Sequence, residues 1–119
     1  MIKGIGIDII EIQRIKRAVH KNNRFINRIL TSNEQEMFNT FTSEKRKLEF
    51  LAGRFAAKEA FAKATAQGIG TLSFQHIEIL SKRNGAPKMT VEGYEREEIF
   101  ISISHSEQYA VAQVIITSK

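Results

Sequence analysis

The sequence predicts an α+β fold, in which an antiparallel sheet packs against one long helix and several shorter helices. Three observations support this prediction: an apolar, β-branched segment opens the chain, a long amphipathic segment occupies its middle, and most strand-like segments follow in the second half. The later segments are joined by short connections, which favour antiparallel pairing. A sheet with one apolar face also needs helices to cover that face.

The first part of the chain predicts a strand followed by a basic helix. Residues 2–10 are apolar and β-branched, punctuated by Gly4 and Gly6, and are typical of a buried strand. The two glycines do not complete a G-x-G-x-x-G motif, so they do not predict a dinucleotide-binding fold. A helix is expected at residues 11–20, because apolar residues recur on one face and basic residues occupy the other. The apolar face comprises Ile12, Ile15 and Val19.

The middle of the chain predicts two further helices. Thr31 and Glu34 match a capping box, so a short helix is expected through Phe38. The longest helix is expected at residues 43–67 and ends at Gly68, since glycine is a common residue just after a helix. Its apolar face comprises Leu48, Leu51, Ala52, Phe55, Ala62 and Ala66.

The remaining segments predict strands. Their apolar and β-branched residues place them at residues 72–80, 89–91, 99–104 and 109–117. Asn84 and Gly85, with Pro87 close behind, mark a tight turn between the first two of these strands.

Length and composition favour one globular domain. The 119 residues, 42% hydrophobic and 26% charged, are enough for one modest core, so a single domain over residues 1–119 is expected. No apolar run approaches the roughly 20 residues that span a bilayer, and the N-terminus has no pattern typical of a secretory signal. The sequence contains no cysteine, which excludes disulfides and thiolate metal sites and fits a cytoplasmic protein.

Basic side chains outnumber acidic ones. Lys plus Arg number 18 against 13 Asp plus Glu, a formal charge of +5. This excess favours an anionic partner, such as a phosphorylated metabolite, an acidic protein or nucleic acid. A small nucleic-acid-binding protein is therefore the alternative to an enzyme; it would explain the basic helix but not the two carboxylates described next.

Two carboxylates interrupt the apolar patterns. Asp8 follows Ile7 and precedes Ile9, and Glu59 falls inside the apolar stripe of the long helix on a wheel of about 100° per residue. A buried, unpaired carboxylate is costly, so each must be neutralised, paired or bound to a metal. Together they predict a site for Mg²⁺, which takes one or two carboxylates and completes its shell with water and substrate phosphates.

Ion pairing is the alternative explanation of these carboxylates. Lys63 lies four residues after Glu59, and Glu–Lys pairs at this spacing are common on helices. Basic residues of the same helix either bind phosphate oxygens or form a solvated face. They are Arg46, Arg54, Lys58 and Lys63.

Of the histidines, only His105 is a functional candidate. His20, His76 and His105 have no zinc-ligand spacing; His20 is expected at a helix end on the surface and His76 in a strand. His105 follows a predicted strand and has a serine on either side. It is therefore either a turn residue or a donor to phosphate, and its serine neighbours favour the second role.

Four segments together resemble the holo-acyl-carrier-protein synthases, bacterial members of the 4′-phosphopantetheinyl transferase family. They are GIGIDIIEIQRI from Gly4, RFINRILTSNE from Arg24, LAGRFAAKEAFAKA from Leu51 and ISISHSEQYAVAQVII from Ile101. They cover nearly the whole chain in the expected order. The combination of G-I-G-x-D with R-F-A-A-K-E-A-x-x-K is specific to the family, whereas either half alone is weak.

The resemblance implies a Mg²⁺-dependent transfer of 4′-phosphopantetheine from coenzyme A to a serine of apo acyl carrier protein, a step that serves fatty acid biosynthesis. Adenosine 3′,5′-bisphosphate would be released. Asp8 and Glu59 would bind the metal against the coenzyme A diphosphate, and Lys63 would contact a phosphate. Further contacts to coenzyme A are implied for Arg46, Arg54, His105, Asn84, Gly85 and Pro87.

The resemblance also implies protein partners. The acidic helix of the carrier protein would dock on basic residues beside one apolar anchor, Phe25. Similar enzymes are homotrimers with sites between subunits, so one chain would supply the carboxylates and another the loop at residues 84–87. The basic docking residues would be Arg14, Arg17, Lys21, Arg24 and Arg28.

Other interpretations remain open at this point. The base that accepts the serine proton is Glu59, a metal-bound water, or an acidic residue near Glu34 or Glu36. An adaptor that only docks the carrier protein would use the basic helix but would need neither carboxylate. The chain departs from the family at Ala66, where a glycine is often found.

Overall fold

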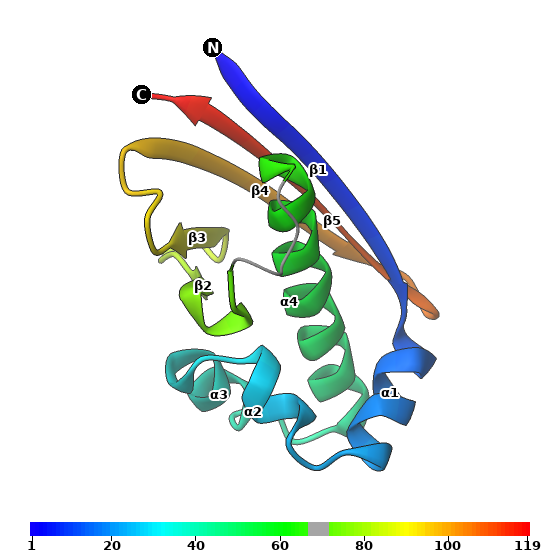
Figure 1. The fold of residues 1–119 in the computed structure, drawn as a ribbon. Coiled ribbons are helices and arrows are strands. Elements are labelled where there is room, and N and C mark those ends of the chain that lie inside the picture. Colours follow the sequence, from blue (N-terminus) through cyan, green and yellow to red (C-terminus); the bar gives the residue numbers. More distant parts are fainter. Residues whose placement is uncertain (67–71) are drawn as a thin grey trace.

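Helix α4 lies across one face of a three-stranded antiparallel sheet, and most of the other elements pack on the far side of this helix (Figure 1). The structure is a computed structural model that describes residues 1–66 and 72–119. It confirms the predicted α+β class. In chain order the elements are β1 (Ile2–Glu11), α1 (Ile12–Lys21), α2 (Phe25–Ile29), α3 (Ser32–Phe38), α4 (Glu44–Thr65), the 3₁₀ turn η2 (Phe74–His76), β2 (Ile77–Ser81), β3 (Pro87–Val91), β4 (Glu97–His105) and β5 (Tyr109–Ser118).

The strands form two antiparallel sheets where the sequence predicted one. The larger has the order β1-β5-β4, and β2 pairs with β3 in a separate hairpin. In the larger sheet Asp8 pairs with Ala112, which pairs in turn with Ile103, so these three residues form one row across the sheet. Two strand spacings of about 4.8 Å separate Asp8 from Ile103.

The paired glycines of β1 let this strand lie directly against α4. A methyl group on Gly6 would overlap the carbonyl oxygen of Ala60, and one on Gly4 would overlap that of Ala64. Any larger residue would push the strand away from the helix. The G-I-G segment therefore serves close packing, and this packing places Asp8, two residues later, beside the C-terminal half of α4.

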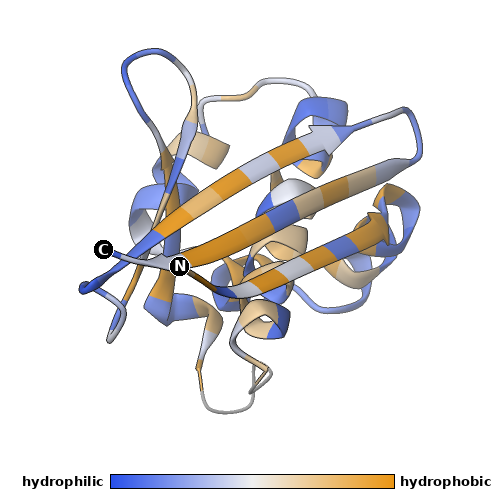
Figure 2. Ribbon diagram, turned by 90° about the horizontal axis from the view of Figure 1, so that it is seen from above, coloured by the Kyte–Doolittle hydropathy of each residue, from blue (hydrophilic) through white to orange (hydrophobic). Residues whose placement is uncertain are grey.

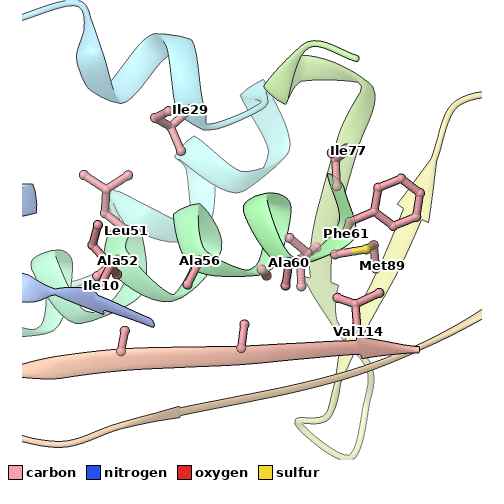
Figure 3. Packing of buried hydrophobic residues seen from close by; sticks show 14 of the residues in the cluster. Ile10, Ile29, Leu51, Ala52, Ala56, Ala60, Phe61, Ile77, Met89 and Val114 are labelled. Carbon is pink, nitrogen blue, oxygen red and sulfur yellow. The ribbon is translucent and has the colours of Figure 1, made fainter. Parts of the chain in front are cut away.

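Alanines on α4 complete this close contact. Ala52, Ala56 and Ala60 are fully buried and point towards strand β5, whereas Leu51 and Ile29 pack on the opposite side of the helix (Figure 3). Small side chains on one face of a helix allow it to sit close to a sheet without leaving voids. The core is thus continuous from the sheet, through α4, to the shorter helices.

The ends of α4 follow cap chemistry. Ser43 precedes the first turn, and its side chain accepts a hydrogen bond from the backbone N–H of Arg46 at 3.1 Å. The helix ends at Thr65, and the next residue, Ala66, adopts the left-handed conformation with φ 62°. The sequence predicts that Ala66 lies inside the helix, but the structure shows that Ala66 is the C-terminal cap. The predicted terminator Gly68 lies outside the described residues.

Other bounds agree with the sequence apart from two local corrections. The capping box of Thr31 and Glu34 is formed in both directions. The strand expected at residues 72–80 begins only at Ile77, because Ser73 accepts a hydrogen bond from the N–H of Gln75 at 2.9 Å and starts the turn η2. His76 therefore lies in a turn rather than a strand. Helix α2 was not predicted.

The outer face of the three-stranded sheet is apolar and uncovered. Figure 2 shows the three strands in front of the helices, with no element in front of them. Ile5, Ile7 and Ile9 of β1 are 55%, 57% and 63% exposed, and Phe100 of β4 is 51% exposed. An apolar surface of this kind typically marks an interaction site. Among the described residues, no helix is long and apolar enough to cross a membrane.

Candidate active site

Asp8 and Lys63 meet at the inner edge of strand β1. Alternate residues of a strand point to opposite faces, so Asp8 points towards α4 while its neighbours Ile7 and Ile9 point outwards. The Asp8 side chain is only 15% exposed. Lys63 Nζ donates to Asp8 Oδ1 at 2.9 Å and to the carbonyl oxygen of Ile7 at 3.0 Å. Lys63 does not form the ion pair with Glu59 that was the alternative to a metal site; it pairs with Asp8 instead.

Glu59 lies one helical turn before Lys63 on α4 and adds a second carboxylate beside Asp8. Partial burial raises the pKa of the Glu59 carboxyl, the negative charge of Asp8 raises it further, and the Lys63 ammonium opposes both effects. The two carboxylates are thus close enough to repel each other. Glu59 is half-buried, and among the described residues it has no ion pair.

The donor set of this cluster fits a hard divalent cation. Two carboxylates that repel each other are stabilised by a cation between them, and Mg²⁺ accepts one or two protein carboxylates when phosphates and water supply its other ligands. Within residues 1–66 and 72–119 there is no group of three or more His, Cys, Asp or Glu side chains that could hold a metal alone. A metal at Asp8 and Glu59 would therefore complete its shell with water or with oxygens of a substrate.

A cationic groove of about 430 Å³ lies between the N-terminal half of α4 and the end of β4. It brings together Arg46, Arg54 and His105, three of the residues predicted to bind coenzyme A. Phe41, Phe50 and Ile103 supply its apolar walls. A groove with three basic side chains and apolar walls suits a ligand with several phosphates and a flat ring.

Arg54 is held rigidly in the wall of this groove. Its Nη2 donates to the carbonyl oxygen of Ile79 at 3.2 Å, and its guanidinium carbon lies 4.2 Å from the centre of the Phe50 ring. Burial lowers the pKa of Arg54, and the charge of Glu34 opposes this effect. The Nε–H is buried and has no partner among the described residues. The side chain is therefore oriented before any ligand arrives.

Glu49 is a charged residue of this groove that the sequence analysis did not single out. Its side chain is 11% exposed, and its carboxylate lies 3.6 Å from His105 Nδ1 and 4.0 Å from Arg46 Nε. The spacing of three residues between Arg46 and Glu49 on a helix is a signal that was present in the sequence. Glu49 thus places a negative charge beside both basic side chains at the rim of the groove.

The carboxylate cluster and the groove lie on opposite flanks of α4. Asp8 is on the edge strand β1 and His105 on the other edge strand β4, with β5 between them. Arg54 and Glu59, five residues apart, differ in direction by about 140° around the helix and by about 7.5 Å along it. Within one chain, the helix therefore separates the residues that the sequence assigned to a single ligand.

The loop of Asn84, Gly85 and Pro87 belongs to neither set. Gly85 has a φ of 85°, and Asn84 Oδ1 accepts from the N–H of Ala86 at 3.0 Å, so the predicted turn between β2 and β3 is confirmed. None of the three residues lines the cationic groove. A larger groove of about 870 Å³ runs between this hairpin and β4, and it contains none of the predicted site residues.

Lys58 is buried, which contradicts both the phosphate-binding and the solvated interpretation. Its Nζ donates to Glu34 Oε1 at 2.7 Å and to the carbonyl oxygens of Ile29 at 2.6 Å and Phe74 at 3.1 Å. Both charged side chains are 0% exposed. Glu34 Oε2 also accepts from the N–H of Ile79 at 2.7 Å. Glu34 is therefore a structural residue and is removed from the candidates for the general base.

The basic residues of the predicted docking surface are all exposed. Arg14, Arg17 and Lys21 are spaced so that they share one face of α1. Phe25 is half-buried and lies 6.1 Å from Phe55, which stacks in turn on Phe74 at 5.7 Å. Arg24 caps the start of α2 and Arg28 lies within this helix, which packs beside α1 (Figure 1). The surface is thus a positively charged rim around a half-exposed aromatic ring.

Comparison with known proteins identifies the family. The sequence model of the 4′-phosphopantetheinyl transferase superfamily matches residues 4–114. The chain belongs to this superfamily. A holo-[acyl-carrier-protein] synthase of Oceanobacillus iheyensis is 55% identical over 119 residues, which cover 100% of this chain and 99% of that protein. The match confirms the family and the enzyme class that the motifs predicted.

Solved structures of the superfamily share this fold. The holo-(acyl-carrier-protein) synthase of Bacillus anthracis, in complex with CoA (3′,5′-ADP), has a TM-score of 0.91 at 45% identity and covers 100% of this chain and 99% of its own. The enzyme of Helicobacter pylori, in complex with coenzyme A, has a TM-score of 0.82 at 35% identity, with 95% and 99% coverage.

Proposed function

We propose that this chain acts as a single cytoplasmic domain that transfers 4′-phosphopantetheine from coenzyme A to a serine of apo acyl carrier protein, releasing adenosine 3′,5′-bisphosphate. The observation that carries the proposal is the cluster of Asp8, Glu59 and Lys63, which supplies two carboxylates and a cation to a substrate diphosphate. The names of the relatives, and the coenzyme A in the Bacillus anthracis and Helicobacter pylori structures, support the substrates.

The two carboxylates and Lys63 would act on the diphosphate in different ways. Asp8 and Glu59 would hold Mg²⁺, which when bound would neutralise charge on the phosphoryl oxygens and keep the reacting groups in line. Lys63 lies within reach of the same position, and its ammonium would donate to a phosphate oxygen.

The cationic groove would bind the nucleotide half of coenzyme A. Arg46, Arg54 and His105 would donate to the phosphates of the 3′-phospho-ADP portion, and Phe41 and Phe50 offer apolar surface to the ring. Arg54 is already held in place by Ile79 and Phe50, so little side-chain entropy would be lost on binding. Asn84, Gly85 and Pro87 would approach the nucleotide from a neighbouring subunit.

A homotrimer with sites between subunits would bring the carboxylate cluster of one chain to the cationic groove of another. Helix α4 stands between the groove and the carboxylates of one chain, so a ligand that uses both would lie between two chains. The apolar outer face of the sheet offers the surface for such an assembly.

The substitution Ile7→Lys tests the assembly, because it would place a charge on this face. We expect the variant to sediment as a monomer and to lose transfer activity, while circular dichroism shows that its fold is retained. An active monomer would contradict the assembly.

The exposed basic face of α1 and α2 would dock the acidic helix of the carrier protein, with Phe25 as its apolar anchor. Arg14→Glu should mainly raise the Michaelis constant for the carrier, because this exposed side chain on α1 would meet the acidic partner directly. An unchanged Michaelis constant would argue against this docking role.

The direct test weighs the product. Apo acyl carrier protein is incubated with the enzyme, coenzyme A and Mg²⁺, and the carrier is weighed by mass spectrometry. We expect a phosphopantetheine adduct that is nearly abolished by Asp8→Ala and by Glu59→Ala. Lys45→Gln is the matched control, since Lys45 lies on the same helix but pairs with Glu107 on the surface. No adduct with several carriers would refute the proposal.

A further inference from the structure

Lys63 supplies the cation that pairs with Asp8 when no metal is bound. Its ammonium satisfies Asp8 Oδ1 at 2.9 Å and is steadied by the carbonyl oxygen of Ile7 at 3.0 Å. Asp8 is mostly shielded from water, whereas the Lys63 side chain is 55% exposed. Among the described residues, Lys63 is the only ion-pair partner of Asp8. The charge of the carboxylate is therefore balanced by an internal cation before any ligand binds.

A lysine held in this position has only one N–H donor left for a phosphate. The ammonium has three N–H donors, and two of them are used by Asp8 and Ile7. A divalent cation bound to Asp8 would also repel the ammonium at this short distance. Binding of the metal and the contact between Lys63 and Asp8 therefore oppose each other.

We infer that Lys63 acts as an internal counter-cation of Asp8, which a divalent metal displaces, and that the displaced ammonium then binds the diphosphate of the substrate. The inference rests on the proposed function and adds the order of events at the same site. Lys63 is on a helix that need not move, because its flexible stem and exposed surface let the ammonium swing outwards. The carbonyl oxygen of Ile7 would then bond to water.

This arrangement couples the metal to the substrate. In the free enzyme, Lys63 competes with the metal and weakens its binding. A diphosphate offers the ammonium another partner and so removes the competitor from Asp8. By thermodynamic linkage, the metal must strengthen diphosphate binding by the same factor. Lys63 therefore controls the metal affinity of Asp8 before the lysine itself contacts the substrate.

The test measures the affinity of Mn²⁺ alone, without carrier protein or turnover. Mn²⁺ is titrated into the folded enzyme, and free ion is followed by electron paramagnetic resonance for the wild type, Lys63→Gln, Lys63→Arg and Lys45→Gln. We expect Lys63→Gln to bind Mn²⁺ roughly fivefold to tenfold more tightly than the wild type. This is the low end of the usual coupling between sites, because solvent screens a half-exposed ammonium. Lys63→Arg and Lys45→Gln should resemble the wild type.

A second titration contains saturating coenzyme A. Coenzyme A should strengthen Mn²⁺ binding more in the wild type than in Lys63→Gln, because only the wild type has a competing cation to remove. Equal Mn²⁺ affinities of the wild type and Lys63→Gln in the free enzyme would overturn the inference, as would a lack of measurable binding to every variant. The mass-spectrometric transfer assay is independent of both titrations, so a failure of the counter-cation role is distinguishable from a failure of the proposed function.

Discussion

Replacement of the buried Lys58 by methionine tests whether this lysine is structural. Its ammonium joins Glu34 to the backbone of Ile29 and Phe74, so it connects α4 with the end of α2, with α3 and with η2. Methionine fills a similar volume but removes the charge and all three hydrogen bonds. The carboxylate of Glu34 would then remain at 0% exposure without its ion-pair partner.

The expected loss of stability follows from that unpaired carboxylate. Removing one partner of a buried ion pair costs about 3–5 kcal/mol, against a typical total stability of roughly 5–15 kcal/mol. Glu34 keeps the N–H groups of Thr31 and Ile79 as donors, which places the expected loss for Lys58→Met near the lower end, about 3 kcal/mol. Adding Glu34→Gln removes the orphaned charge, so the double variant should be less damaged than the sum of the single variants by roughly 2 kcal/mol.

The measurement is urea unfolding followed by circular dichroism at one fixed protein concentration. Lys45→Met is the matched control, because Lys45 lies on the same helix with a 64% exposed side chain and pairs with the exposed Glu107. This control should change the free energy of unfolding by less than about 0.5 kcal/mol. A loss below about 1 kcal/mol for Lys58→Met, or strict additivity in the double variant, would refute the structural role.

Three further substitutions test single features of the structure. Gly6→Ala should lower the free energy of unfolding by about 1–3 kcal/mol and weaken Mn²⁺ binding, because the new methyl group meets the carbonyl of Ala60; unchanged urea unfolding would contradict this close contact. Ala66→Gly should raise stability by roughly 1 kcal/mol, since glycine tolerates φ 62° better than alanine; a lower melting temperature would contradict the assigned cap. The raised pKa of Glu59 means that its ionised form destabilises the fold once the pH rises through that pKa. Glu59→Gln should therefore raise the melting temperature of the metal-free protein at pH 7 but not at pH 4, and should weaken Mn²⁺ binding; an equal shift at both pH values would contradict the charge effect.

Local signals in the sequence located most of the fold. The capping box of Thr31 and Glu34 and the turn at Asn84 and Gly85 were read correctly because cap and turn chemistry acts over four or five residues. Helix α2 was missed because its five residues are too few to show helical periodicity. The start of β2 was misplaced because the Ser73 side chain starts a turn within an apolar segment.

The site was harder to predict because it depends on contacts between distant residues. Lys58 and Lys63 look alike in the sequence, yet one is buried against Glu34, 24 residues away, and the other reaches Asp8, 55 residues away. A helical wheel of α4 shows only residues of that helix, so it does not reveal partners on other elements. Glu49 shows the same limit: its spacing from Arg46 was visible, but its contact with His105 depends on how β4 packs against α4.

Strand β1 shows how one short segment can couple assembly to chemistry. The sequence correctly suggested that Asp8 is shielded, but its isoleucine neighbours are not what shields it. They point outwards and form the uncovered face, while Gly6 and Asp8 point inwards to α4. Because strand residues alternate between the two faces, the position of the inward carboxylate is fixed relative to the outward apolar surface. In the proposed trimer, contacts made by the outward face would therefore also set the position of Asp8 relative to the groove of a neighbouring subunit.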